Sequence, residues 1–564
     1  MRKRNYWIVI AGIYFFIQVF VTSCANISTP TGGPKDTIPP ALVKVNPTGG
    51  AVHYNERIVR LEFNEAVQVK DLANQLIITP SIQGEYKTKI NKNTVELLFQ
   101  QPFDTNTTYT LSFREGISDL NEGNPVEDLQ LAFSTGAFLD SMSISGTVQR
   151  LLTGEPVADA LVGLYRAKDT LNIFNSRPYY LSKTDETGFF QFNNLKVGEY
   201  LLYATADANR NLKTEASNEP FGFIKDTIYL NSNIDSLNIN LLSINTNPPA
   251  VNSARPSGPY FDIRLNKAVK DYELQPLEET EEPLYSNLVE ENKTIRVYNA
   301  WPIQDSLATF LSLTDSLGQQ LQDTVYVKFQ ESKREKGPFE YTVIPKSGAA
   351  VEKDFTATIS FTKPVKEVNT DSLFIRYDSL TTVQIVPEKD FTWNSRRDRL
   401  EINKLLEPTK TIANQSSEKA SLQEEIPVQP TATNGFSLHL GKAAFISAEQ
   451  DSSKASELSY RWADAKNFGL LQGRFSSEAD SFTIQLLDAN TFKVVKEVEN
   501  QHNFTFNYVA PGEYRIRVLI DENENGQWDP GNIYERIEPE PVILLDETIS
   551  LKANWELKEI EVRE

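Results

Sequence analysis

Oxygen-bearing side chains alternate along one short stretch near the C-terminus, "DENENGQWDPGN", which begins at Asp521. Asp521, Asn523 and Asn525 occupy positions 1, 3 and 5 of this stretch, and a glycine follows at position 6. Gln527 would offer its backbone carbonyl at position 7, and Asp529 its carboxylate at position 9. A hard cation such as Ca²⁺ takes about six to eight oxygen ligands, and a glycine permits the sharp bend. The spacing therefore predicts a structural calcium site formed by these five residues.

The same stretch also fits an acidic turn whose side chains cap their own backbone amides. Position 12, where a bidentate glutamate closes a calcium loop, is Asn532, and Glu535 would replace it only if the fold brought it round. The related loop Asp207–Asn211 keeps the 1-3-5 pattern but has an arginine at position 4 and Leu212 at position 6. Both interpretations stay open for Asp521–Asp529, and the second loop favours the turn.

Motifs for catalysis are weak. His53 and Glu56 have the His-x-x-Glu spacing of zinc carboxypeptidases, but a catalytic zinc needs a third ligand, and the other two histidines lie in different modules. Ser416 and Lys419 match Ser-x-x-Lys, but they fall in a polar, low-complexity loop rather than at a rigid helix start. A hydrolase that uses paired carboxylates, which an acidic chain always offers, predicts a deep pocket lined by such a pair.

Aromatic residues raise a further class of function. Sugars stack on exposed aromatic rings, although single tryptophans in strands are more often packed in a core or at an edge. The candidates for such a platform are Trp301, Trp393, Trp462 and Trp528. A carbohydrate-binding protein would gather them on one exposed face, and Trp528 would fold back over the predicted calcium loop.

Short strands must position these groups. Arg60–Phe63, Asn503–Tyr508 and Tyr514–Val518 alternate apolar and polar residues, which is typical of half-buried strands. Turn clusters such as "NPTGG", "NEGNP" and "APGEY" separate them, and no long helical period occurs. The pattern predicts an all-β chain of β-sandwiches.

Internal repeats divide the chain. "PPALVKVNPTGGAVHYNERIVRLEFNEAV" from Pro39 is echoed from Pro338, with a poorer copy from Asn247. A second kind of module contains "GFFQFNNLKVGEYLLYATADANRN" from Gly188, which aligns with "HNFTFNYVAPGEYRIRVLIDENENG" from His502. The first kind resembles the bacterial Ig-like domain of S-layer proteins, and the second resembles the carboxypeptidase-regulatory or transthyretin-like sandwich. Together they are similar to Ig-like-domain lipoproteins of Bacteroidota, a resemblance that implies architecture and little about activity.

The N-terminus predicts export. Arg2-Lys3-Arg4 precede an apolar run, and the only cysteine of the chain, Cys24, follows Val21-Thr22-Ser23. This arrangement resembles a bacterial lipobox, in which the cysteine is lipidated with palmitate-type chains and becomes the first residue. The residues after it, from Ala25 to Ser28, lack the acidic character of surface-directed lipoproteins. We therefore expect an outer-membrane anchor that favours the periplasmic face, with the cell surface as the alternative.

Charge restricts the partners. The chain has a formal charge of −20, and removal of the signal leaves 53 Lys and Arg residues against 76 Asp and Glu residues. Nucleic acids need a basic footprint, so they are excluded as partners. A membrane reached through the lipid anchor, an envelope protein or a neutral glycan fits this charge.

The sequence as a whole predicts tandem Ig-like and transthyretin-like sandwiches in an elongated array. Its function would be that of a non-enzymatic, lipid-anchored envelope scaffold, with a carbohydrate-binding surface lipoprotein as the alternative. Calcium is the only cofactor expected. The predicted segments are a signal peptide (1–23), a tether (24–36), an Ig-like domain (37–137), a carboxypeptidase-regulatory-like sandwich (138–245), a degenerate Ig-like domain (246–334), a second Ig-like domain (335–463) with a flexible insert (408–433), and a transthyretin-like sandwich (464–564).

Overall fold

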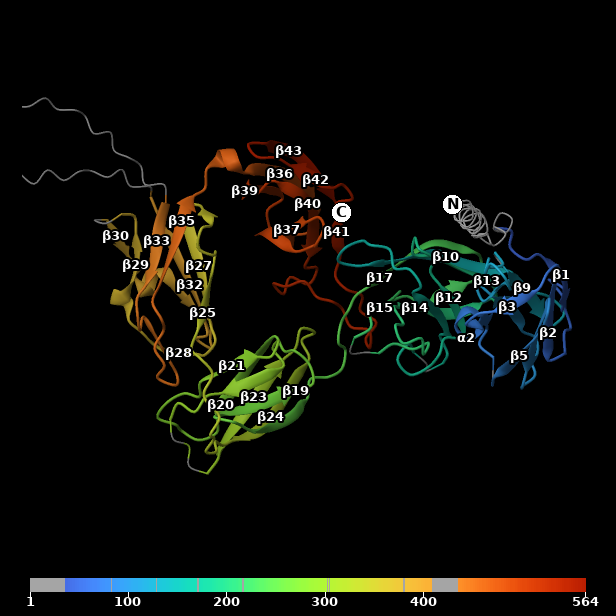
Figure 1. Cartoon of the computed structure of the whole chain (residues 1–564), viewed down its shortest axis with the longest axis horizontal. Helices are drawn as coiled ribbons and strands as arrows, with labels where there is room; N and C mark the ends of the chain where they lie inside the picture. Colours follow the sequence, from blue (N-terminus) through green and yellow to red (C-terminus); the bar gives the residue numbers. More distant parts are fainter. Residues whose placement is uncertain are drawn as a thin grey trace, which may run out of the picture. The chain divides into compact units, whose positions relative to one another are not determined.

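The computed structural model describes residues 36–407 and 435–564, apart from residues 83, 128, 170, 171, 216, 217, 302, 304, 379 and 380. The predicted signal peptide, Cys24 and the insert 408–433 lie outside these residues, as do Ser416 and Lys419. The described part of the chain is built of strands, shown as arrows in Figure 1. Its helical segments are limited to α2 (Leu72–Gln75), α3 (Pro387–Asp390), and the 3-10 turns η1 (Thr370–Ser372) and η2 (Ala465–Asn467). None of its helices is long and apolar enough to cross a membrane.

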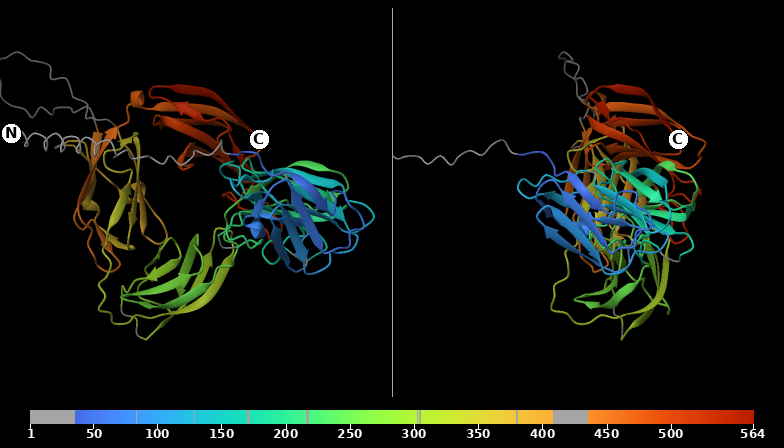
Figure 2. Two further views of the ribbon diagram at one scale, coloured as in Figure 1. Left: turned by 45° about the vertical axis from the view of Figure 1, so that its right-hand side comes forward. Right: turned by 90° about the vertical axis from the view of Figure 1, so that its right-hand side faces the viewer.

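The chain divides into two compact units. One contains the residues up to Ser143 together with Tyr179–Leu181 and Asn193–Val197, and the other contains the remaining residues up to Glu564. In each unit the strands form small, mainly antiparallel sheets. Figure 2 shows these sheets from two further directions.

The first sandwich has the sheet orders β1-β2-β6-β5, β4-β7-β9 and β3-β8. In β2, Val59, Leu61 and Phe63 are buried and the residues between them are not, as the alternation of apolar residues requires. Its strands are β1 (Leu42–Asn46), β2 (Ile58–Phe63), β3 (Val67–Val69), β4 (Ile77–Thr79), β5 (Tyr86–Asn91), β6 (Thr94–Phe99), β7 (Thr108–Ser112), β8 (Ile117–Asp119) and β9 (Gln130–Ser134).

The second sandwich pairs the sheet β13-β10-β17 with the sheet β12-β11-β14-β15, in which β16 also pairs with β14. The pairing of β10 with β17 is parallel. Its strands are β10 (Met142–Arg150), β11 (Leu161–Arg166), β12 (Tyr180–Lys183), β13 (Phe189–Leu195), β14 (Gly198–Thr205), β15 (Phe221–Phe223), β16 (Ile228–Leu230) and β17 (Ile234–Leu241).

The third sandwich has the sheet orders β18-β19-β22-β21 and β20-β23-β24. Leu307, Leu311 and Leu313, all on β23, are buried in its core. Its strands are β18 (Val251–Ser257), β19 (Tyr260–Leu265), β20 (Asp271–Pro276), β21 (Ser286–Val289), β22 (Thr294–Val297), β23 (Leu307–Thr314) and β24 (Gln320–Val327).

The fourth sandwich has the sheet orders β25-β27-β32-β31, β26-β35-β33-β29-β30 and β28-β34. Phe355, Phe436 and Phe445 are buried in its core. Its strands are β25 (Tyr341–Ile344), β26 (Ala350–Val351), β27 (Asp354–Phe361), β28 (Val365–Val368), β29 (Leu373–Arg376), β30 (Thr382–Gln384), β31 (Phe391–Trp393), β32 (Arg399–Leu405), β33 (Gly435–Leu440), β34 (Phe445–Ser447) and β35 (Ser456–Trp462).

The fifth sandwich repeats the sheet plan of the second. Its sheet orders are β39-β36-β43 and β38-β37-β40-β41, with β42 also paired to β40 and with β36 parallel to β43. The prediction of tandem all-β sandwiches is confirmed by these sheets. The strands are β36 (Gly469–Ser476), β37 (Phe482–Asp488), β38 (Val494–Glu499), β39 (Asn503–Val509), β40 (Gly512–Ile520), β41 (Val542–Leu544), β42 (Ile549–Leu551) and β43 (Glu556–Arg563).

Candidate functional site

The predicted calcium residues lie in the long connection Asp521–Pro541 between β40 and β41. Asp521 directly follows β40 and is only 6% exposed. Its Oδ1 accepts a hydrogen bond from the Asn525 amide (3.1 Å), and its Oδ2 accepts from the Gly526 amide (2.9 Å) and the Ser481 hydroxyl (2.8 Å). Burial acts to raise the pKa of Asp521, but these hydrogen bonds outweigh it and hold the pKa below its usual value.

The other predicted ligands gather around Asp529. Its Oδ2 accepts from the side-chain amides of Asn523 (2.8 Å) and Asn525 (2.6 Å), while Gln527 Nε2 lies 3.5 Å from its Oδ1. The five residues singled out in the sequence therefore form one connected cluster, and side-chain amide nitrogens point at the carboxylate. Among the described residues, no group of three or more His, Cys, Asp or Glu side chains is spaced to hold a metal ion. A cation here would depend on amide and main-chain oxygens beside the carboxylates.

Glu540, and not Glu535, brings an additional carboxylate to the loop. It is 8% exposed, and its carboxylate accepts from the backbone amides of Asn523 (3.2 Å) and Asp529 (2.7 Å). Trp528 folds back as expected, because its indole N–H donates to the Glu540 carbonyl (2.9 Å). Glu535 is exposed, and its amide donates to Asn532 Oδ1 (3.3 Å). No sequence pattern pointed to Glu540, because its position depends on the return of the chain toward β41.

The related loop after β14 has the same internal plan. Asp207 accepts from the amides of Asn211 (3.1 Å) and Leu212 (2.9 Å). Glu219 is 4% exposed and accepts from the amides of Ala208 (3.0 Å) and Glu215 (2.8 Å), in the role that Glu540 has in the other loop. Each loop therefore satisfies its backbone amides with its own carboxylates, as an acidic capping turn does.

The backbone is also alike in the two loops. Glu524 (φ 55°) and Gly526 (φ 85°) adopt the left-handed conformation, and so do Arg210 (φ 61°) and Leu212 (φ 63°) at the same positions. The bend for which a glycine was expected therefore forms with leucine as well.

The segment after the acidic cluster packs on the second sandwich, within the same compact unit. Ile533 is buried in a cluster that includes Tyr203, Phe221 and Phe223. The Arg536 guanidinium donates to the carbonyl oxygens of Ile224 (2.7 Å) and Lys225 (2.9 Å) and to the Tyr203 hydroxyl (3.0 Å). These contacts tie residues of the fifth sandwich to residues of the second.

Two further bonds strengthen this attachment. Glu538 Oε1 accepts from the Lys225 amide (2.9 Å), so the loop both donates to and accepts from the same residue. On β40, Arg517 donates to the Leu152 carbonyl (2.8 Å) and is itself held by Gln485 Oε1 at 2.7 and 3.0 Å. Burial lowers the pKa of Arg517 from its usual value, and Arg still carries its charge at neutral pH.

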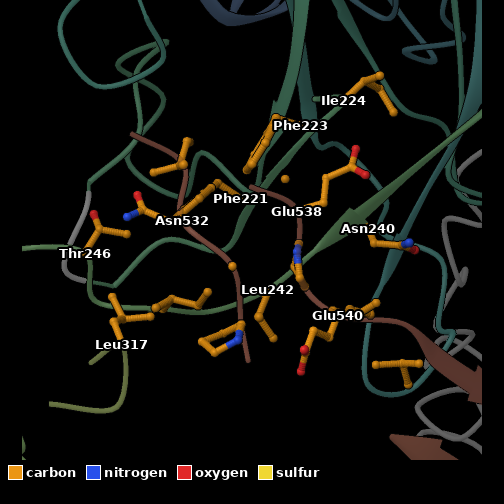
Figure 3. Close-up of a pocket in the computed structure, with 18 of the residues that line it drawn as sticks. Phe221, Phe223, Ile224, Asn240, Leu242, Thr246, Leu317, Asn532, Glu538 and Glu540 are labelled. Atoms are coloured by element: carbon orange, nitrogen blue, oxygen red, sulfur yellow. The ribbon is translucent and has the colours of Figure 1, made fainter. Parts of the chain in front are cut away.

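A cavity of about 440 Å³ lies beside this attachment. Figure 3 shows side chains from three stretches of chain around it, among them Phe221 and Leu242, Leu317, and Asn532 with Glu538 and Glu540. Its lining presents polar and apolar surface in nearly equal amounts, and the polar groups are chiefly amides and the two glutamates. Within the described residues, the Thr246 hydroxyl and Gln319 Oε1 are buried without a hydrogen-bond partner. Both glutamates are already bonded to backbone amides, which is a structural use rather than the arrangement of a hydrolytic pair.

The remaining candidate residues are not brought together. His53 is exposed on the first sandwich, whereas His439 lies on β33 and His502 next to β39. Glu56 Oε2 accepts a hydrogen bond from the Asn46 side chain (3.2 Å). Burial and the nearby Glu56 carboxylate together raise the pKa of Tyr54 to about 12. Within the described part of the chain, His53 and Glu56 belong to no group of three His, Cys, Asp or Glu side chains that could hold a metal ion.

The four tryptophans lie in three different sandwiches. Trp301 packs against the core of the third, Trp393 and Trp462 against the core of the fourth, and Trp528 lies in the loop of the fifth. They form no shared platform for a sugar.

Residues 36–135 match the family model described as "Bacterial Ig-like domain". A comparison with curated protein sequences finds no match. Among solved structures, the chain is similar to the surface layer protein SbsC, domains 1–6 (10% identity, 93% of this chain and 68% of that chain, TM-score 0.15). It is also similar to BcpA, the major pilin subunit of Bacillus cereus (10%, 75% and 99%, 0.12), and to dimeric latent PorU from Porphyromonas gingivalis (8%, 57% and 36%, 0.21). Likenesses this weak carry no argument about function. Residues 36–135 therefore resemble a bacterial Ig-like domain, in a chain whose other described sheets also form β-sandwiches.

Proposed function

We propose that this protein is a non-enzymatic, lipid-anchored scaffold of the bacterial cell envelope that holds, spaces or binds another envelope component. The observation that carries the proposal is the attachment of the Asp521–Pro541 loop to the second sandwich through Ile533, Arg536 and Glu538. A long loop on a rigid sandwich is a common location for an enzyme's active groups. Here its charged side chains brace one sandwich against another instead.

The bacterial Ig-like match at residues 36–135 supports an envelope location. Cys24 would carry the acyl chains, and at ~0.8 kcal/mol per buried CH₂ several chains hold a protein firmly on a membrane. The absence of acidic residues after Cys24 favours the periplasmic face of the outer membrane. Replacement of Cys24 by Ala should abolish labelling of the protein with palmitate, and added protease should leave the wild type intact until the outer membrane is opened.

An open sheet edge offers one way to bind a protein partner. Strand β38 lies at the edge of the sheet β38-β37-β40-β41, and Val494 and Val495 on it are each 44% exposed. A partner strand could add there through main-chain hydrogen bonds, with the two valines as the apolar contact. The test is cross-linking in intact cells followed by purification of the full-length lipoprotein. One recurrent envelope protein, lost in a Val494→Lys variant, supports this role, and the absence of any recurrent protein contradicts it.

We also propose that the Asp521–Asp529 loop takes a structural Ca²⁺ through Asp521, Asn523, Asn525, Gln527 and Asp529, with Glu540 as an added carboxylate. The proximity of Asn523 and Asn525 to Asp529 supports this proposal, although both side-chain amides would have to turn their oxygens toward the cation. A ligand that binds only the folded state raises the free energy of unfolding, by about 2.7 kcal/mol at a ligand concentration of 100 Kd, and the melting midpoint rises with it. The full chain should melt at higher temperature in calcium than in chelator, and Asp529→Ala should remove the difference while Glu215→Ala in the related loop keeps it. Equal midpoints in calcium and chelator would leave the loop as an acidic capping turn.

A further inference from the structure

Three aromatic side chains meet at one end of the sheet β39-β36-β43 in the fifth sandwich. Phe468, Tyr508 and Trp555 line a groove of about 190 Å³ together with Asn507 and Asn554. The rings of Phe468 and Tyr508 are edge to face with centroids 6.0 Å apart. Trp555 is 44% exposed, and Lys552 Nζ lies over its ring at 4.8 Å from the centroid. The Tyr508 hydroxyl, the Trp555 indole N–H and both side-chain amides have no hydrogen-bond partner within the described residues.

A β-bulge brings Tyr508 to this groove. Gly469 pairs with Val509 and Leu471 pairs with Phe506, so Asn507 and Tyr508 together oppose one residue of β36. Tyr508 adopts a φ of 49°, which is uncommon for a bulky side chain. Bulges of this kind turn a side chain away from the regular alternation, and strained residues persist where the surroundings hold them.

Main-chain hydrogen bonds join the segment that contains Phe468 to the segment that contains Trp555. Phe468 directly follows η2, and its carbonyl accepts from the Asn554 amide (2.8 Å). The Trp555 carbonyl accepts from the Leu470 amide (2.8 Å). The groove is therefore held by the main chain of the fifth sandwich itself.

The second sandwich provides an internal comparison, because it is another copy of the same module. In the aligned sequences the position of Tyr508 is occupied by Asn194, which has a similar φ of 56°. Asparagine tolerates this conformation far better than tyrosine.

The turn that carries Trp555 also differs between the copies. It comprises residues 552–555 between Leu551 and β43, whereas residues 231–233 join Leu230 to β17 and include no aromatic residue. The second sandwich therefore folds without this aromatic groove, and its Asn194 instead accepts a hydrogen bond from the Thr110 hydroxyl and donates one to the Asp140 carbonyl.

We propose that this groove binds a neutral saccharide. The C–H faces of a sugar ring suit the electron-rich faces of exposed aromatic rings. The side-chain amides of Asn507 and Asn554 each donate and accept hydrogen bonds, as sugar hydroxyls do, whereas a proline-rich peptide offers mainly carbonyl acceptors. An anionic sugar is disfavoured by the net charge of −20. This role goes beyond the scaffold function, which would stand if the groove bound nothing.

The groove has room for more than one sugar unit. Phe468 and Tyr508 also line an adjoining cavity of about 410 Å³, together with Val351, Phe355 and Lys496. A chain of linked sugars laid across Phe468 and Tyr508 would reach from one cavity into the other. We therefore expect an oligosaccharide to bind more tightly than the corresponding monosaccharide.

The test is calorimetric titration of the full chain in detergent with tetramers to hexamers of glucose, mannose and N-acetylglucosamine, and with a proline-rich decapeptide. We expect at least one oligosaccharide to bind and to change the tryptophan fluorescence. Trp555→Ala and Tyr508→Asn should each weaken it by about tenfold or more, which corresponds to ~1.4 kcal/mol. Tyr229→Ala removes a tyrosine that is 68% exposed on the second sandwich, and should leave the affinity unchanged.

Tyr508→Asn also separates binding from folding, because the second copy already accepts asparagine at this position. An unchanged melting curve together with lost saccharide binding supports the proposal. The proposal is overturned if no oligosaccharide of the panel binds, if binding is equally strong in Trp555→Ala and Tyr508→Asn, or if the proline-rich peptide occupies the groove instead.

Discussion

Asp521 is the carboxylate on which the long loop of the fifth sandwich depends most directly. Its pKa lies below the usual value because the folded loop surrounds the ionised form with hydrogen-bond donors. A carboxylate with a lowered folded pKa contributes stability above its unfolded pKa of about 4, and this contribution disappears as the pH falls through the folded value. The loop should therefore open in acid and be fully closed at neutral pH.

We predict that hydrogen exchange of the peptide 512–528 in the full chain accelerates as the pH falls below about 4, after correction for the intrinsic rate. Asp521→Asn should lose part of this pH dependence, since the asparagine side chain carries no charge for the loop to stabilise. At pH 7 the free energy of opening measured for this peptide should be lower in the variant by ~1–3 kcal/mol. Asp546→Asn, in a turn of the same sandwich, serves as a control. Equal pH profiles for Asp521→Asn and the wild type would contradict this account.

A buried ion pair, Lys267 with Asp315, stabilises the part of the third sandwich that lines the cavity. Lys267 Nζ lies 2.6 Å from Asp315 Oδ2, and the two side chains are 4% and 0% exposed. Asp315 Oδ1 accepts from the amides of Leu317 and Gln319 (2.8 Å each), which places these two residues in the cavity lining. Lys267→Ala leaves a buried charge without its partner and should destabilise the third sandwich by about 3–5 kcal/mol.

Replacement of both partners distinguishes the pair from its components. Lys267→Met combined with Asp315→Leu removes the uncompensated charge and should recover part of the loss. Differential scanning calorimetry of the full chain measures both effects. A double variant that is no more stable than Lys267→Ala would show that the backbone bonds of Asp315 matter more than its charge.

At the scale of elements, the two acidic loops show what the alternating pattern can and cannot predict. Asp521, Asn523 and Asn525 lie in one cluster, as alternate residues of a single turn do, and the calcium site predicted from their spacing stays a prediction. Glu540 could not be predicted, since its position depends on the whole return of the chain to β41. A glycine at position 6 is not required for the bend, because Leu212 adopts the same left-handed conformation in the related loop.

Gly526 still has a measurable advantage. An added Cβ would meet no atom within 4 Å, so a substitution there tests the backbone alone. Gly526→Ala should lower the stability of the fifth sandwich by about 1 kcal/mol, because φ is 85°. Gly49→Ala, also in open space but without a left-handed φ, should not be destabilising. Thermal melting of both variants gives the comparison, and equal behaviour would mean that the loop relaxes.

The strands were the most predictable elements, and the bulge in β39 marks the limit of that prediction. Alternation along Asn503–Tyr508 puts Phe504, Phe506 and Tyr508 on one face, and the first two are indeed buried. At the bulge the alternation shifts by one residue, so Val509 takes the core position and Tyr508 turns to the groove. A sequence pattern of period two contains no sign of an extra residue, and the aromatic groove was missed for that reason.

At the scale of the molecule, the contact between the second and fifth sandwiches joins residues that are remote in sequence. Arg536 and Ile224 are 312 positions apart. We predict that Arg536→Ala speeds hydrogen exchange at Phe221–Lys225 without melting the fifth sandwich. The Arg536 guanidinium bonds the Ile224 and Lys225 carbonyls from outside the sheet, so its loss should loosen this segment alone. Arg474→Ala, an exposed arginine on β36, should leave this exchange unchanged. Unaltered exchange in Arg536→Ala would show that Ile533 alone maintains the contact.

The contact at Arg536 also sets an order of events during synthesis. A ribosome that adds about 5–20 residues per second needs roughly 15–60 s to pass from Ile224 to Arg536, which is ample time for a small domain to fold. Until residues 533–536 are in place, Phe221 and Phe223 pack only against side chains of their own sandwich, such as Tyr165, Ile173 and Tyr203. A chain cut before Asp521 would therefore leave part of these two rings open to chaperones and proteases.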